Sequence, residues 1–130
     1  YNITMNINIK ATNIELTEAI RDYVEKKVNS LEKFLSNENT NTQVEVAKTT
    51  NHHKNGDVYH TEIDIRSGSK KFFVRAEGSE LYASIDEARE MMMRELTHNN
   101  DRQRTLFKRG AMSVKKMLKG LSKRNPSTSK

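Results

Sequence analysis

The chain has 130 residues, of which 31% are charged and 34% apolar, and its net charge is +6. The apolar share is below that of an ordinary globular domain, so part of the chain is predicted to lie outside a packed core. The chain has no cysteine, which excludes disulfides, thiol chemistry and cysteine-based metal sites. No stretch approaches the roughly 20 apolar residues of a spanning helix, which excludes a transmembrane helix.

The charge is divided unevenly along the chain. Residues 1–100 hold 13 Lys and Arg against 16 Asp and Glu, a net charge of −3, whereas residues 101–130 hold 10 against one, a net charge of +9. A basic tail of this kind is typical of segments that bind nucleic acid or an acidic membrane. We therefore expect a folded domain at residues 1–100 and a basic C-terminal extension at residues 101–130.

The N-terminal third of the chain predicts a strand, a helix and a loop. Apolar and polar residues alternate over residues 3–9, which is the period of a half-buried strand, and Thr12 and Asn13 break the pattern. From Leu16 the apolar residues recur at helical spacing, so a helix is predicted from the N-cap Thr17 to about Leu35. Residues 36–41 are polar and rich in Asn, which indicates a loop.

Three further strands and a second helix follow. The alternation resumes around Val44 and Val46, over residues 59–66 and over residues 72–77, with turns at Asn55-Gly56 and Ser67-Gly68-Ser69. Ser79 is predicted to cap a second helix that ends near Asn99-Asn100. Its buried stripe is predicted to be Leu81, Ile85, Ala88, Met92 and Leu96.

The element order is therefore β-α-β-β-β-α. Elements that each have one apolar face bury those faces in two layers, so we predict an α+β two-layer sandwich with both helices on one face of a four-stranded sheet. The first helix is a crossover between parallel strands, and the other strands form antiparallel meanders. The opposite face of the sheet is expected to meet water through Asn6, Asn8, Glu62, Asp64 and Arg75.

The tail contains apolar residues at helical spacing, from Phe107 to Leu121, among many lysines. Gly110 and Gly120 each weaken a helix by about 1 kcal/mol relative to Ala. We expect the free tail to be disordered and to order on a partner, with residues 125–130 free. Binding to phosphates is the favoured interpretation, and a solvated solubility tail is its alternative. The two glycines and the lack of Trp argue against a membrane-surface helix.

Residue types that carry catalysis are sparse. His52 and His53 are adjacent in a turn-rich loop, but no third ligand accompanies them at a fixed spacing, so no metal site is predicted. The chain has no Gly-rich phosphate loop and no G-x-S-x-G motif. Glu62 and Asp64 share a solvent-facing strand surface, which is the ordinary setting of a solvated pair. The sequence therefore predicts neither an enzyme nor a cofactor, and no small-molecule substrate.

Two segments resemble a known family. Residues 15–24 (ELTEAIRDYV), followed by Lys27 and by residues 31–34 (LEKF), are similar to the first helix of the hibernation-promoting factors. Residues 76–86 (AEGSELYASID) resemble that family's entry into its second helix. The resemblance covers residues 3–100, and the family has the same β-α-β-β-β-α order.

The resemblance implies a cytosolic protein that binds ribosomal RNA of the small ribosomal subunit near the decoding centre. There it would block messenger and transfer RNA and stop translation in starvation or stationary phase. Positions that match the family's RNA contacts are Arg21, Lys27, Tyr82, Asp86 and Arg94. The three cations would pair with phosphates, and Tyr82 would stack or form hydrogen bonds with RNA. The alternative for Tyr82 and Asp86 is that they hold the start of the second helix together.

The chain departs from the family at Ser30, Met91 and residues 98–100, where basic residues are frequent. The tail is predicted to compensate through Arg102, Arg104, Lys108, Arg109, Lys115, Lys116 and Lys119. Thirty polar residues are too few for the second domain of long family members, so we expect a short-type factor or a truncated long one. The alternative function is a general RNA-binding module that does not distinguish ribosomes from other RNA, and neither function involves a membrane.

Overall fold

The computed structural model describes residues 4–36, 39–50 and 56–128, with the stretch 121–128 described by its backbone alone. The elements are listed here in chain order: β1 (Thr4–Thr12), α1 (Glu18–Asn29), the 3-10 helix η1 (Glu32–Phe34), β2 (Asn39–Thr50), β3 (Asp57–Ser67), β4 (Lys70–Gly78) and α2 (Leu81–Thr128). The chain forms two compact units that divide between Thr97 and His98. The predicted order of strands and helices is confirmed.

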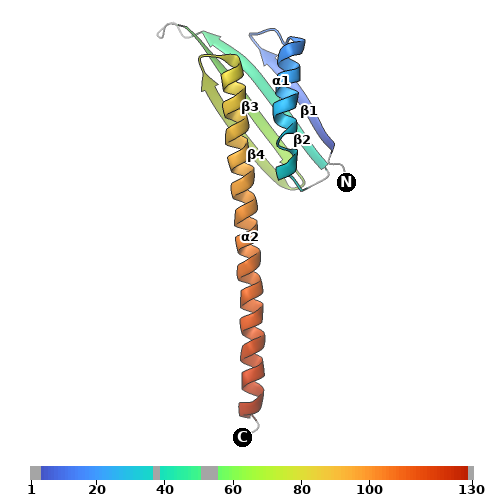
Figure 1. Ribbon diagram of the computed structural model, residues 1–130, viewed down its shortest axis with the longest axis vertical. Coiled ribbons are helices and arrows are strands. Elements are labelled where there is room, and N and C mark those ends of the chain that lie inside the picture. Colours follow the sequence, from blue (N-terminus) through green and yellow to red (C-terminus); the bar gives the residue numbers. More distant parts are fainter. Residues whose placement is uncertain (1–3, 37–38, 51–55, 129–130) are drawn as a thin grey trace. The chain divides into compact units, whose positions relative to one another are not determined.

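The four strands form one mixed sheet in the order β1-β2-β3-β4 (Figure 1). β1 pairs with β2 in parallel, from Thr4 opposite Asn39 to Thr12 opposite Ala47. β3 is antiparallel to β2, and β4 is antiparallel to β3. The predicted parallel crossover and the two antiparallel meanders are therefore confirmed. Gly68, with a φ of 63°, supplies the positive φ of the tight β3–β4 turn.

The core lies between the sheet and the two helices. Alternate strand residues such as Val46, Ile63 and Val74 are buried against the helices, and α1 contributes Ile20, Val24 and Val28. The first part of α2 contributes Ile85, Ala88, Met92 and Leu96, as predicted. A buried hydroxyl pair, Thr61 and Ser84, lies 2.8 Å apart and links β3 to α2. Both helices cover the same face of the sheet (Figure 1), which confirms the two-layer architecture.

The opposite face of the sheet is polar, and no helix in the described part of the chain covers it. Asn6, Asn8 and Arg75 are exposed there, as expected, whereas Glu62 and Asp64 are half-buried. Both carboxylates lie on the central strand β3, with a strand on either side. Phe73 also lies on this face, with 58% of its surface exposed.

Strand and helix boundaries differ from the predicted ones in the first half of the chain. β1 continues to Thr12 and ends before Asn13, whose φ is 63°. β2 starts at Asn39, inside the predicted loop 36–41, because Thr40 and Thr42 continue the buried face with polar side chains. Hydrophobic alternation does not detect a buried threonine, so the loop prediction was wrong from residue 39 onward.

The first helix is shorter than predicted. Thr17 is its N-cap, because its hydroxyl accepts a hydrogen bond from the Ile20 amide at 3.2 Å. The helix ends at Asn29 rather than near Leu35. The Ser30 hydroxyl donates to the Lys27 carbonyl, and the Leu31 amide donates to Val28, which tightens the chain into the 3-10 turn of η1.

The second helix differs at both ends. It begins at Leu81, with the Glu80 carbonyl accepting the first helical hydrogen bond from Ser84, so Ser79 is not its cap. It continues through Asn99 and Asn100 to Thr128, and it includes residues 125–128, which were predicted to be free. Neither Asn has the positive φ of a helix end. The prediction that the tail orders only on a partner stays a prediction.

Candidate nucleic-acid interface

A polar cluster joins α1 to the first turns of α2 and contains three of the predicted RNA contacts. The Tyr23 hydroxyl donates a hydrogen bond to Asp86 Oδ1 at 2.6 Å, and Lys27 Nζ lies 3.2 Å from the same oxygen. The rings of Tyr23 and Tyr82 meet edge to face, with centroids 4.8 Å apart. We call Tyr23, Lys27, Tyr82, Asp86 and Arg89 the interhelical cluster.

Asp86 is the central anion of this cluster. Its hydrogen bond raises the pKa of Tyr23 above the ordinary value, and burial adds to the rise. The hydrogen bond from Lys27 to the same carboxylate raises the pKa of Lys27. Because both pKa values are raised, their contribution to stability is present at neutral pH and is lost only as the pH rises through the raised values. Asp86 therefore joins the two helices, and its predicted contact with RNA stays a prediction.

Arg89 belongs to the cluster, although the sequence analysis did not select it. Its Nε donates to Ser30 Oγ at 2.9 Å, and its Nη1 donates to Glu90 Oε1 at 2.8 Å. The available signal was its position three residues after Asp86 and seven after Tyr82, on the same stripe of α2. Ser30, a departure from the family's pattern, serves here as the acceptor for a cation from the other helix.

Arg21 and Arg94 lie apart from the interhelical cluster. Arg21 is exposed on α1, and its place two residues before Tyr23 puts it about 200° around the helix from that residue. Arg94 Nη2 lies 3.5 Å from Glu87 Oε1, and both side chains are more than half exposed, so the pair contributes little to stability. The five predicted contacts in the folded unit therefore do not form a single patch.

The seven predicted contacts of the tail lie on the second unit, which is helical and whose side chains are exposed over residues 100–120. The sole acidic residue of the segment 101–130 is Asp101, and Arg104 Nη1 lies 4.0 Å from it. Helical spacing puts Lys108, Lys115 and Lys119 on one side and Phe107, Val114 and Leu118 on another. The tail thus presents a basic stripe beside an exposed apolar stripe.

Substitution of Tyr23 tests the link between the helices. We expect Tyr23→Phe to lower the free energy of unfolding by about 1 kcal/mol, because it removes the hydrogen bond to Asp86 and leaves the ring in place. Urea denaturation of the purified protein measures the change. Tyr59→Phe is the matched control, since the structure assigns its hydroxyl no hydrogen bond within the described residues. Equal stability of Tyr23→Phe and the wild type would contradict this role.

Comparison with known proteins places the folded unit in a family. Residues 7–104 match the model of the family described as Sigma 54 modulation protein / S30EA ribosomal protein. The chain belongs to this family. Two relatives are named ribosome hibernation promoting factor: the Escherichia coli K12 protein is 29% identical over 99 residues, and the Klebsiella oxytoca protein is 33% identical over 104 residues. Each match covers 75% of this chain and 96% of the relative.

Solved structures of similar proteins share the fold. The N-terminal domain of Protein Y from Thermus thermophilus has a TM-score of 0.62 and 27% identity, over 72% of this chain and 98% of that one. A ribosomal subunit interface protein from Coxiella burnetii has a TM-score of 0.56 and 15% identity, over 72% of this chain and 97% of that one. The resemblance seen in the sequence is confirmed, and the family match ends at residue 104, before most of the tail.

Within the described residues, no helix combines the length and the apolar character that a membrane crossing requires.

Proposed function

We propose that the protein is a non-enzymatic ribosome hibernation factor of the cytosol. It binds the small ribosomal subunit near the decoding centre, blocks messenger and transfer RNA, and inhibits translation in stationary phase or starvation. The observation that carries the proposal is the family match over residues 7–104, together with relatives named ribosome hibernation promoting factor that the chain covers almost completely.

The folded unit offers some of the contacts that this function needs. Tyr82 keeps 43% of its surface exposed, so one side of its ring is open to stack on a base. Lys27 and Arg89 belong to the same interhelical cluster, and Arg21 and Arg94 extend the potential contacts to phosphate along both helices. Lys27, Arg89 and Arg94 each form an ion pair with an acidic side chain, which reduces their attraction for phosphate.

The electrostatic balance supports a large contribution of the tail to the affinity. α1 and the part of α2 up to Thr97 together hold five basic residues against seven acidic ones, so the helical layer is not basic overall. The tail has ten basic residues and one acidic residue. Most protein contacts to nucleic acid go to the phosphate–sugar backbone and depend on such charge. We therefore assign shape and position to the folded unit and most of the salt-dependent affinity to the tail.

Co-sedimentation with ribosomes tests the proposal. We expect saturable pelleting of the full chain with intact ribosomes and with the isolated small subunit, together with inhibition of translation in a cell-free system. An excess of unstructured RNA or duplex RNA separates the alternative function, since a general RNA-binding module would be displaced by either one. Absence of pelleting at low salt would exclude ribosome binding altogether.

A further inference from the structure

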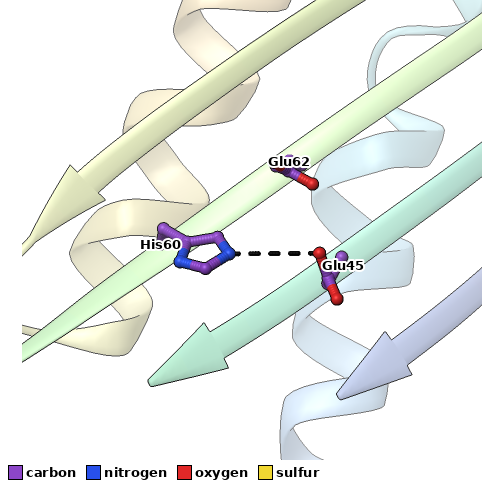
Figure 2. A group of neighbouring side chains, drawn as sticks. All are labelled: Glu45, His60 and Glu62. Carbon is purple, nitrogen blue, oxygen red and sulfur yellow. Dashed lines mark ion pairs between the residues drawn. The ribbon is translucent and has the colours of Figure 1, made fainter. Parts of the chain in front are cut away.

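Three side chains with metal-binding atoms converge on the polar face of the sheet, away from both helices. Glu45 of β2 and Glu62 of β3 are paired directly across the two strands, and His60 precedes Glu62 by two residues on the same face. One nitrogen or oxygen atom from each of the three lies within 4.8 Å of the others. His60 Nε2 points toward Glu45 Oε1, at 4.0 Å (Figure 2). We propose that Glu45, His60 and Glu62 form a binding site for a divalent transition metal, with Zn²⁺ as the best-suited ion.

The ion pairs that Glu45 and Glu62 form with neighbouring strands lie on their outer sides, and the stronger one joins Arg75 Nη1 to Glu62 Oε1 at 3.1 Å. Two carboxylates directly opposite each other on neighbouring strands repel, which destabilises a sheet unless a cation lies between them. The cations that the register supplies lie at the flanks: Lys10 beside Glu45 on β1, and Arg75 beside Glu62 on β4. Lys10 Nζ is 4.0 Å from Glu45, and 78% of its side chain is exposed, so its attraction is weak. The space between the two carboxylates faces His60 instead.

The partner of the His60 ring is Glu45, at a distance beyond a hydrogen bond. The His60 side chain is 13% exposed, and its Nε2 lies 4.0 Å from Glu45 Oε1. Coordination of a metal through Nε2 would replace this distant pair with a direct bond and would also neutralise the two facing carboxylates.

The outer oxygens of both carboxylates already have the donors that a metal site needs around its ligands. The Thr12 hydroxyl donates to Glu45 Oε2 at 2.8 Å, which leaves Oε1 directed at His60. Arg75 Nη1 donates to Glu62 Oε1 at 3.1 Å. Hydrogen bonds of this kind orient ligating carboxylates and raise metal affinity.

The donor set and its dimensions indicate which ion fits. One imidazole nitrogen with two carboxylate oxygens is a ligand set that zinc uses, with a further position left for water. Ligand atoms around tetrahedral zinc lie about 3.3 Å apart, as metal–ligand distances near 2.1 Å require. Closing the site from its present spacing takes about 1 Å of movement at each ligand atom, which side-chain rotation supplies on a rigid sheet. The three residues come from two strands, so their spacing in the sequence gives no metal-binding motif.

Titration of the metal-free full chain with zinc chloride tests the proposal. We expect one Zn²⁺ per chain by calorimetry and a rise in the unfolding temperature of about 5 °C or more at saturating zinc. His60→Gln and Glu45→Gln should each weaken zinc binding at least tenfold, while circular dichroism and the zinc-free unfolding temperature report that each variant is folded. Asp64→Asn, on the same face of β3 and outside the cluster, is the matched control and should bind zinc like the wild type.

Two results would overturn the metal site. The first is the absence of saturable zinc binding by the full chain. The second is binding that persists in His60→Gln and disappears in a double variant, His52→Ala with His53→Ala, which would assign the metal to the loop. Neither outcome affects ribosome binding by the tail and helices, so this proposal and the proposed function fail independently.

Discussion

A chain that ends at Asn100 should lose most of its affinity for ribosomes. Each phosphate that a cation neutralises contributes about 0.7 to 0.9 to the slope of log K against log salt concentration. If the seven described tail cations each contact a phosphate, removing the tail should reduce the slope by about 5. The affinity for ribosomes near 0.1 M salt should then fall about a thousandfold or more. Co-sedimentation of both chains over a series of salt concentrations measures the slope and the affinity together.

The control for this experiment keeps the chain length and removes charge elsewhere. Replacing Arg66, Lys70 and Lys71 with Gln takes three exposed cations from the β3–β4 hairpin, outside both proposed contact regions. This variant should keep the wild-type salt slope, whereas Gln at Lys115, Lys116 and Lys119 should reduce it by about 2 to 3. An unchanged slope after removal of residues 101–130 would show that the tail is a solubility segment.

Replacing Ile63 with Ala should have the largest effect on stability. Ile63 lies in the middle of β3 with 1% of its surface exposed, and it faces the core under both helices. Such a truncation costs about 4 kcal/mol, through lost burial and the cavity left behind. That is a large share of the stability of a small domain and corresponds to a fall of about 15 °C or more in the unfolding temperature. Urea and thermal unfolding, followed by circular dichroism, measure it.

Phe73→Ala provides the matched control on the other face of the sheet. Phe73 lies on β4 opposite Asp64, the neighbour of Ile63 in the sequence, and it is 58% exposed. Its truncation should change the free energy of unfolding by about 0.5 kcal/mol or less, as is usual for surface positions. A cost equal to that of Ile63→Ala would mean that another chain covers this face in solution, contrary to the two-layer description.

The order, pairing and layers of the elements were predictable because apolar residues repeat at the period of each helix or strand and are buried. Val24, Ile63 and Met92 are examples from α1, β3 and α2, and all three are buried. The apolar pattern failed to predict element boundaries where polar residues are buried, and where the sequence has no residue that ends a helix. Thr40 and Thr42 continue β2 without an apolar signal, and the pair Asn99-Asn100 lacks the backbone conformation that ends a helix.

The candidate sites were predictable only in part. Lys27, Tyr82 and Asp86 were found through the family resemblance, and the structure brings them together. Arg89 was missed because its partner Ser30 is 59 residues away in the chain. The cluster of Glu45, His60 and Glu62 depends on which residue of β2 faces which residue of β3. Alternation fixes the face of each strand but not this register, so the cluster had no signal in the sequence.

The parallel pairing of β1 has a consequence for the growing polypeptide. Thr4 pairs with Asn39, so the first strand to be synthesised waits for α1 and the start of β2 before any backbone ladder is available to it. β2, β3 and β4 then add in turn, each against the strand made just before it. The apolar side of the sheet stays partly bare until Leu96 has been made. The nascent domain therefore closes only when synthesis reaches the boundary with the basic tail.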